Sequence, residues 1–285
     1  MSPLLKLELG RAFGNRLFLL CLVLGVGIAV VAAVESTVTY YADFNQVMPY
    51  LETSFMSQFA QGAFTLWMPT AVMRSVPNLF FFIAPLLAAL AYSWSWRSDI
   101  KSGYAASLLM RTSRSQWNRA KAVAAFLAGG SVVCLPLLIN LAIILCCVPA
   151  YTPDITDVVY TGLWRKVFLS EVLYTCPAAY VALRLCLDFL LAGLWATTVL
   201  ALSRFMRNRV AIVALPYLGL VIVKYVSEAL YVMTGVQFGA LTILDHLKAR
   251  GDQFYYDWPP LLIGIATMVA ISVAIPLLTR ERDVL

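Results

Sequence analysis

The stretch RSDIKSGYAASLLMRTSRSQWNRAK, residues 97–121, is the polar segment around which the rest of the chain can be arranged. Apolar runs long enough to cross a bilayer flank it at residues 76–96 and 122–148. Six of its residues are basic and one is acidic. Because Lys and Arg resist translocation, a basic loop between two spans is expected on the cytoplasmic side of the membrane.

Four apolar residues inside this stretch recur at helical spacing and predict a short amphipathic helix. They are Tyr104, Ala105, Leu108 and Leu109. Several arginines follow them, so the segment could bind anionic lipid headgroups at the membrane surface. It could equally pack its apolar face into a groove on a cytoplasmic partner and pair its arginines with acidic rims.

The composition indicates an all-α polytopic membrane protein. The chain has 285 residues, of which 61% are hydrophobic and 13% charged, with a mean hydropathy of +0.81. Soluble domains carry about twice that charged fraction. Apolar runs of roughly 20 residues also argue against a β-barrel, whose strands alternate in polarity. The net charge of +6 comes from residues clustered at span ends, so no nucleic-acid partner is expected.

Six apolar runs are predicted to span the membrane, and they form a single domain without repeats or linkers over residues 1–285. The runs are residues 17–34, 76–96, 122–148, 180–203, 210–230 and 258–279. The segments predicted to lie inside carry 14 Lys and Arg and four acidic residues, whereas the outer segments carry five and nine. The positive-inside rule therefore predicts that both termini are cytoplasmic.

Residues 1–16 are predicted to form an interfacial helix before the first span. Leu4, Leu5, Leu9 and Phe13 lie roughly on one helical face, while the charged residues point elsewhere. A cleaved signal peptide is the alternative interpretation. The apolar run that follows has 18 residues without a charge, longer than the usual apolar core of about 7–15, which favours a retained span.

Three polar segments, residues 35–75, 149–177 and 231–257, are predicted to lie on the outer side. The first is too aromatic for a linker and is expected to form short helices, either as an interfacial aromatic belt or as a substrate-binding surface. An interfacial helix is expected over residues 162–174 in the second. His246, in the third, is expected to be an ordinary surface residue.

Two charged pairs lie inside predicted spans, Arg184 with Asp188 and Lys224 with Glu228. Each pair is four residues apart and shares a helix face. If the two spans are adjacent, all four charges lie at a similar height near the outer leaflet. They could form an outer gate or polar vestibule, or simply two local ion pairs. Asn140, a lone amide in a span, is expected to make a helix–helix hydrogen bond.

The chain lacks the motifs of common catalytic and nucleotide-binding sites. There is no GxxxxGK[ST] phosphate loop, no HExxH and no GxSxG. The six cysteines lie in or beside apolar runs without metal-ligand spacing, so neither a metal site nor a cofactor is expected on this chain. We expect no catalytic residue here, and any energy for work would come from another subunit.

The basic loop and the order of the spans resemble the membrane subunit of type-2 ATP-binding-cassette (ABC) exporters. That family shows an acidic residue, a glycine four residues later, a hydrophobic stretch, and then Arg and Lys before the third span. The matching residues here are Asp99, Gly103, Leu108 with Leu109, Arg114 and Lys121. The ending RERDVL, with Arg282 and Asp283, is similar to the family's basic tail. The resemblance covers essentially the whole chain.

The resemblance implies that residues 97–121 form a cytoplasmic coupling loop whose helix docks on a separate P-loop ATPase. The coupling residues would be Asp99, Gly103, Leu108, Leu109, Arg111, Arg114 and Lys121. Residues 1–16 would be the elbow helix. Two ATPase copies, which bind ATP and Mg, would join this chain and a second permease subunit, identical or related, in a bacterial inner membrane.

The resemblance implies ATP-driven export as the function. Because the spans carry few charges, the expected substrate is hydrophobic or amphipathic, such as a peptide, lipid or drug. A non-transporting sensor or scaffold that uses the same ATPase is the alternative. A membrane-embedded enzyme is disfavoured because catalytic constellations are missing.

Overall fold

The computed structural model describes residues 3–51, 61–71, 74–153, 168–206, 208–234, 242–248 and 258–279. Within these ranges all regular elements are helices and none is a strand. Six of the described helices are long and apolar enough to span a membrane. The predicted all-α architecture with six candidate spans is therefore confirmed.

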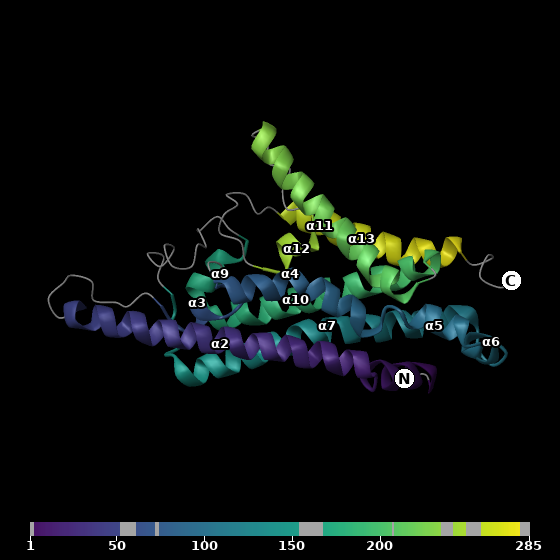
Figure 1. Cartoon of the computed structure of the whole chain (residues 1–285), viewed down its shortest axis with the longest axis horizontal. Coiled ribbons are helices and arrows are strands. Elements are labelled where there is room, and N and C mark those ends of the chain that lie inside the picture. Colours follow the sequence, from purple (N-terminus) through teal and green to yellow (C-terminus); the bar gives the residue numbers. More distant parts are fainter. Residues whose placement is uncertain are drawn as a thin grey trace.

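Each predicted apolar run coincides with a long helix (Figure 1). These helices are α2 (Arg16–Leu51), α4 (Ser75–Tyr92), α7 (Arg114–Cys147), α10 (Pro177–Leu202), α11 (Arg209–Thr234) and α13 (Trp258–Leu278). The shorter described elements are α1 (Pro3–Phe13), α3 (Ala63–Leu66), α5 (Ser95–Lys101), α6 (Tyr104–Leu109), α9 (Ser170–Thr175), the 3₁₀ turn η2 (Ser203–Phe205) and α12 (Ile243–His246).

The first span differs from the prediction, because α2 continues through residues 35–51 instead of giving way to separate short helices. The polar side chains there do not interrupt the backbone ladder, and Thr39 Oγ1 donates to the carbonyl of Glu35 one turn earlier, at 2.8 Å. Without a glycine, and with Pro49 only near its end, this segment holds nothing that breaks a helix earlier. The change from apolar to polar residues therefore does not mark the end of this helix.

Helix α7 lies at the centre of the bundle, where it contacts α1, α2, α4 and α10. Its closest approach to α10 uses glycines on both sides. A Cβ at Gly130 would lie 2.8 Å from the ring of Phe189, and a Cβ at Gly193 would lie 2.6 Å from the ring of Phe126. Each helix thus inserts a phenylalanine against a glycine of the other, which is how small residues allow membrane helices to pack closely.

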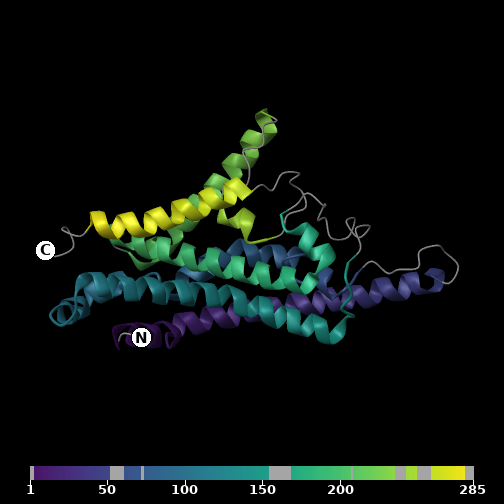
Figure 2. The ribbon, with the colours of Figure 1, turned by 180° about the vertical axis from the view of Figure 1, so that it is seen from behind.

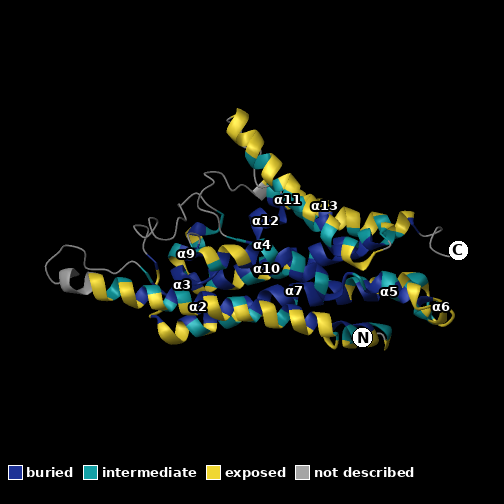
Figure 3. Cartoon of the chain, viewed as in Figure 1, coloured by how far each residue is buried: buried dark blue, intermediate teal, exposed yellow. Residues whose placement is uncertain are grey.

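Helices α11 and α13 lie on the outside of this bundle. Figures 1 and 2 show α11 rising away from the other helices towards Thr234. In Figure 3 the buried residues follow α4, α7 and α10, whereas α11, α13 and much of α2 are exposed. Apolar side chains such as Ile222 and Leu262, which are 60% and 56% exposed, suit contact with lipid or another protein.

One end of the bundle gathers α1, α5, α6 and the carboxyl end of α13, as both ribbon views show (Figures 1 and 2). The two ends of the described chain thus lie at the same end of the bundle, consistent with termini on one side of a membrane. Residues 280–285, which carry the predicted basic tail, lie outside the described residues.

The outer segments contribute to the core more than predicted. Trp67, expected in an aromatic surface, is fully buried and its Nε1 donates to the carbonyl of Leu137 at 3.1 Å. The buried amide of Asn140 accepts from the backbone N–H of Met68 at 3.1 Å and donates to the carbonyl of Ala29 at 2.9 Å. This confirms the predicted interhelical hydrogen bond of Asn140. Of the helix expected over 162–174, residues 162–167 lie outside the described residues, and the described part contains the short helix α9, Ser170–Thr175.

Candidate functional site

The predicted coupling loop, residues 97–121, is almost entirely helical. It consists of the end of α5, the whole of α6 and the first two turns of α7, which begins at Arg114 rather than after Lys121. Ser113 supplies the N-cap of α7, since its side chain accepts from the backbone N–H of Gln116. The cap, not the onset of apolar residues, determines where this helix starts.

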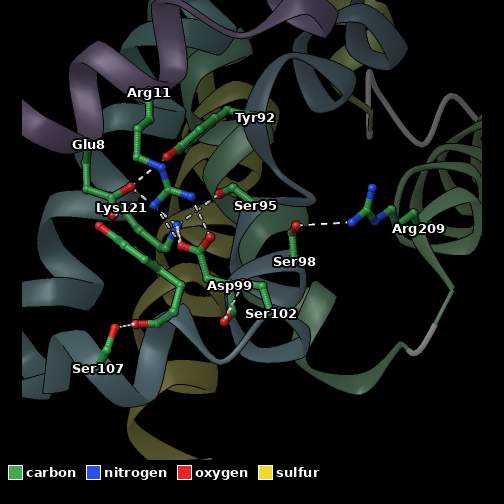
Figure 4. Close-up of polar contacts among 11 residues, drawn as sticks. Glu8, Arg11, Tyr92, Ser95, Ser98, Asp99, Ser102, Ser107, Lys121 and Arg209 are labelled. Atoms are coloured by element: carbon green, nitrogen blue, oxygen red, sulfur yellow. Dashed lines mark hydrogen bonds and ion pairs between the residues drawn. The ribbon is translucent and has the colours of Figure 1, made fainter.

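A cluster of four charges joins the loop to the N-terminal helix (Figure 4). Arg11 of α1 binds both carboxylate oxygens of Asp99, at 2.6 and 3.0 Å. Lys121 Nζ lies 2.7 Å from Asp99 Oδ2 and 3.3 Å from Glu8 Oε2. We call Glu8, Arg11, Asp99 and Lys121 the charge cluster; its two acids and two bases come from α1, α5 and α7.

Three of the four members of the charge cluster are withdrawn from solvent, whereas the side chain of Arg11 is 37% exposed. Glu8, Asp99 and Lys121 are 0%, 2% and 1% exposed. Tyr92 donates its hydroxyl to Glu8 at 2.6 Å, and Lys121 also donates to Ser95 Oγ at 3.3 Å. Buried charges are tolerated when they are paired and hydrogen-bonded. Removing one partner destabilises the protein, because the other charge is then buried without compensation. The cluster therefore holds the two ends of the predicted loop, Asp99 and Lys121, together and fastens α1 to them.

Arg11 is the residue that extends this cluster to α6. Hydrogen bonding to Asp99 raises the pKa of its guanidinium, which keeps the group charged. The same guanidinium carbon lies 4.4 Å from the ring centroid of Tyr104, the first residue of α6. This cation–π contact connects α1 to the short helix.

Helix α6 begins at a backbone position that suits glycine. Gly103 has φ +74°, in the left-handed region, and separates α5 from α6. A side chain there would be strained although nothing lies within 4 Å of its Cβ position. The predicted short helix over Tyr104–Leu109 is confirmed, and Gly103 supplies the bend that reorients it.

The exposed face of α6 is not the one expected. Leu108 and Leu109, predicted to enter a partner's groove, are half-buried against the chain's own core. Met110 is instead 84% exposed, and Arg111 beside it is exposed too. The helical spacing of the leucines predicted an apolar face correctly. That face packs largely against other residues of the same chain.

The predicted coupling residues thus fall into two groups. Asp99 and Lys121 lie inside the charge cluster and cannot touch a partner directly in this conformation. Arg111 is exposed and Arg114 half-exposed, at the turn that joins α6 to α7. The sequence did not indicate Glu8, Arg11 and Tyr92 as partners of the loop, although an acid within an otherwise basic amphipathic helix was a signal that could have been used.

A second set of contacts closes the same end of the bundle. Arg204, in η2, donates to Thr279 Oγ1 at 3.0 Å and to Asn118 Oδ1 at 3.1 Å. Its guanidinium carbon also lies 4.8 Å from the ring centroid of Trp96. One arginine therefore links η2 with α5, α7 and the carboxyl end of α13.

At the other predicted site the two charged pairs differ in burial. Arg184 and Asp188 are 2% and 0% exposed, with Nη2 3.2 Å from Oδ1. Lys224 and Glu228 are 3.9 Å apart, and their side chains are 20% and 43% exposed. Both predicted i,i+4 pairs are present. The first pair is thus buried on α10, whereas the second is partly exposed on α11, and a shared gate stays a prediction.

The prediction for His246 was wrong, because this residue is 2% exposed. It ends α12, whose four residues are all buried and which contacts α4 and α11. Arg184 Nη2 donates to the backbone carbonyl of His246 at 2.5 Å. A cation at the carboxyl end of a helix is favourable, so Arg184 holds this segment against α10.

No metal-binding group of three or more His, Cys, Asp or Glu occurs among the described residues. Neither protein-family models, nor curated proteins, nor solved structures match this chain.

Proposed function

We propose that the chain is the membrane subunit of a type-2 ABC exporter and that α6 is the helix through which a separate P-loop ATPase acts on it. The observation that carries this proposal is the placement of α6. It lies at the extremity of the bundle that gathers α1 and the carboxyl end of α13 (Figure 1), with Met110 and Arg111 exposed beside it. An exposed apolar side chain next to a cation suits a groove on a partner protein that is bordered by acidic residues.

The contacts behind α6 support a role in transmitting motion. Arg11 joins α6 to α1 through Tyr104, and Asp99 joins Arg11 to α5. Lys121 then connects the same carboxylate to α7, the central helix. A displacement of α6 would therefore reach α1 through the cation–π contact of Arg11 and α7 through the short ionic contacts of Asp99, instead of through a flexible loop.

We place this end of the bundle in the cytoplasm, in a multi-pass protein of a bacterial inner membrane. The excess of Lys and Arg in the segments at this end supports that orientation. ATP and Mg would be bound by two copies of the partner ATPase, and a second permease subunit would complete the assembly.

The substrate class we propose is hydrophobic or amphipathic, such as a peptide, lipid or drug. Besides the apolar spans, a cavity of about 170 Å³ between α10, α11, α12 and α13 supports this class. Its lining is mainly apolar and includes Trp195 and Met268, with polar groups from His246 on α12 and from Thr242, the N-cap of α12. Such a mixture suits a ligand with an apolar body and a polar end.

Co-purification in mild detergent with mass spectrometry tests the proposal. A P-loop ATPase at one-to-one stoichiometry is expected, and Met110→Glu with Arg111→Glu should remove it by placing acids against an acidic rim. Lys6→Glu, on an exposed position of α1, is the matched control and should retain it. A preparation without an ATPase contradicts the proposal. An ATPase that moves no hydrophobic probe in vesicles would instead indicate a sensor or scaffold.

A further inference from the structure

A basic recess lies between α5 and the start of α11, separate from the charge cluster and from α6. It has a volume of about 440 Å³ and is lined by Arg97, Ser98, Lys101, Asn208 and Arg209. These residues bring three cations, a hydroxyl and an amide to one hollow. They come from segments more than 100 residues apart, so the sequence does not place them together.

The described walls of this recess carry positive charge only. None of the five described lining residues is acidic. The acid of α5, Asp99, is buried and its carboxylate is bound by Arg11 and Lys121. Because Arg11 and Lys121 already bind the carboxylate of Asp99, this carboxylate does not neutralise Arg97 and Lys101. The positive charge of the recess is therefore available to an external anion.

The depth of the recess is indicated by Arg209, the first residue of the membrane-spanning helix α11. Its guanidinium carbon lies 5.3 Å from the ring centroid of Trp94. Its Nη2 donates to Ser98 Oγ at 3.2 Å (Figure 4). Arginine and tryptophan at the end of a span are typical of the headgroup level of a bilayer. Arg209 is thus held in place at the depth where phosphates of one leaflet lie.

We propose that this recess binds the phosphate headgroup of an anionic phospholipid. Arg97 and Arg209 supply planar pairs of N–H donors that match phosphate oxygens, and Lys101 adds a further charge. Ser98 and Asn208 provide neutral polar groups beside them. The acyl chains would then lie along the exposed apolar face of α11, where Leu215 and Leu218 are 53% and 51% exposed.

Position favours a lipid over an acidic protein surface as the occupant. A protein that docks at this end meets α6 first, because α6 lies farther out than α5 (Figures 1 and 2). The recess instead lies beside the end of a spanning helix, within reach of the bilayer. The proposal does not depend on the ATP-driven export proposed above.

Native mass spectrometry of the purified full chain, titrated with phosphatidylglycerol or phosphatidylcholine, tests this site. The variant Arg97→Gln/Lys101→Gln removes two cations while Arg209 keeps its contacts with Trp94 and Ser98. Since each basic residue near an anionic surface contributes on the order of a fivefold factor, the variant should bind phosphatidylglycerol about tenfold or more weakly. Its affinity for phosphatidylcholine should not change.

The control Lys6→Gln/Arg16→Gln removes the same charge from exposed positions outside the recess and should retain the wild-type affinity for phosphatidylglycerol. Three results would overturn the proposal. The first is an equal loss in this control, which indicates unspecific charge attraction. The second is that the chain retains an adduct of inorganic phosphate but binds phosphatidylglycerol no more tightly than it binds phosphate. The third is loss of a co-purified protein from Arg97→Gln/Lys101→Gln with unchanged lipid affinity. The single variant Arg97→Gln, expected to show a smaller loss in the same direction, serves if the double variant does not fold.

Discussion

Lys121 Nζ lies 2.7 Å from Asp99 Oδ2, with both side chains almost completely buried. These two residues mark the two ends of the basic segment between the second and third spans. Their contact turns that segment from an open loop into a closed unit, and Glu8 and Arg11 attach the N-terminal helix to the same point. The stability of this end of the molecule should therefore depend on the balance of four charges.

Replacing Lys121 with methionine should strongly destabilise the protein. The change keeps much of the side-chain volume but leaves the buried carboxylates of Glu8 and Asp99 facing a single cation, Arg11. Breaking a buried pair in this way costs about 3–5 kcal/mol. Thermal unfolding in detergent should show a clearly lower midpoint, whereas Arg119→Met, on an exposed position of the same helix, should leave it nearly unchanged.

Replacing Glu8 with lysine should release α1 from the bundle. The substitution brings a third cation beside Arg11 and Lys121 and removes the acceptor of the Tyr92 hydroxyl. Hydrogen exchange should accelerate across Pro3–Phe13 while α10 keeps its protection. Lys6→Glu alters the charge of an exposed position in the same helix and should not have this effect. Unchanged exchange in Glu8→Lys would show that the apolar contacts of α1 alone hold it.

Replacing Gly103 with alanine should destabilise the junction between α5 and α6 by about 1–2 kcal/mol, because an L side chain is strained at φ +74°. Gly219, inside α11, provides the opposite case, since its Cβ position is open and its backbone is helical. Gly219→Ala should therefore stabilise the protein by roughly 0.5–1 kcal/mol. Unfolding midpoints of the two variants measured side by side should move in opposite directions.

The two charged pairs of the spans should respond unequally to alanine. Arg184→Ala leaves Asp188 buried without its cation and frees the carbonyl of His246, so a loss of about 3–5 kcal/mol is expected. Lys224→Ala breaks a partly exposed pair and should cost less than about 1 kcal/mol. Comparable unfolding midpoints for the two variants would show that Arg184 is not the anchor of α12.

The six spans could be predicted from the sequence because roughly 20 apolar residues in a row are a local property that only a bilayer accommodates. The short helix after Gly103 was also predictable, since helical spacing is local, whereas the bend at Gly103 itself was found only in the structure. The end of α2 and the start of α7 were predicted less well. At both places the composition changes between apolar and polar residues without a break in the helix. The helix α2 continues to Leu51, and the helix α7 begins already at Arg114.

Side-chain partners across the bundle could not be predicted in the same way. Trp67 and His246 lie in polar segments and were assigned to the surface, yet both are buried, because short helices between the spans fold back onto the core. Leu108 and Leu109 were correctly seen as an apolar face, but the sequence does not say whether that face meets a partner or the chain itself.

The sequence by itself determined the class of this protein, its six candidate spans and the concentration of positive charge in the segments between them. Hydrophobicity and charge are properties of single residues and act through the solvent, so no partner needs to be known. Only the tertiary structure decided that Glu8 and Arg11 complete a cluster with Asp99 and Lys121, since the bonded pairs Arg11–Asp99 and Glu8–Lys121 are 88 and 113 residues apart along the chain. Such pairings depend on which helix faces are brought into contact, and that follows from the packing of α1, α5 and α7.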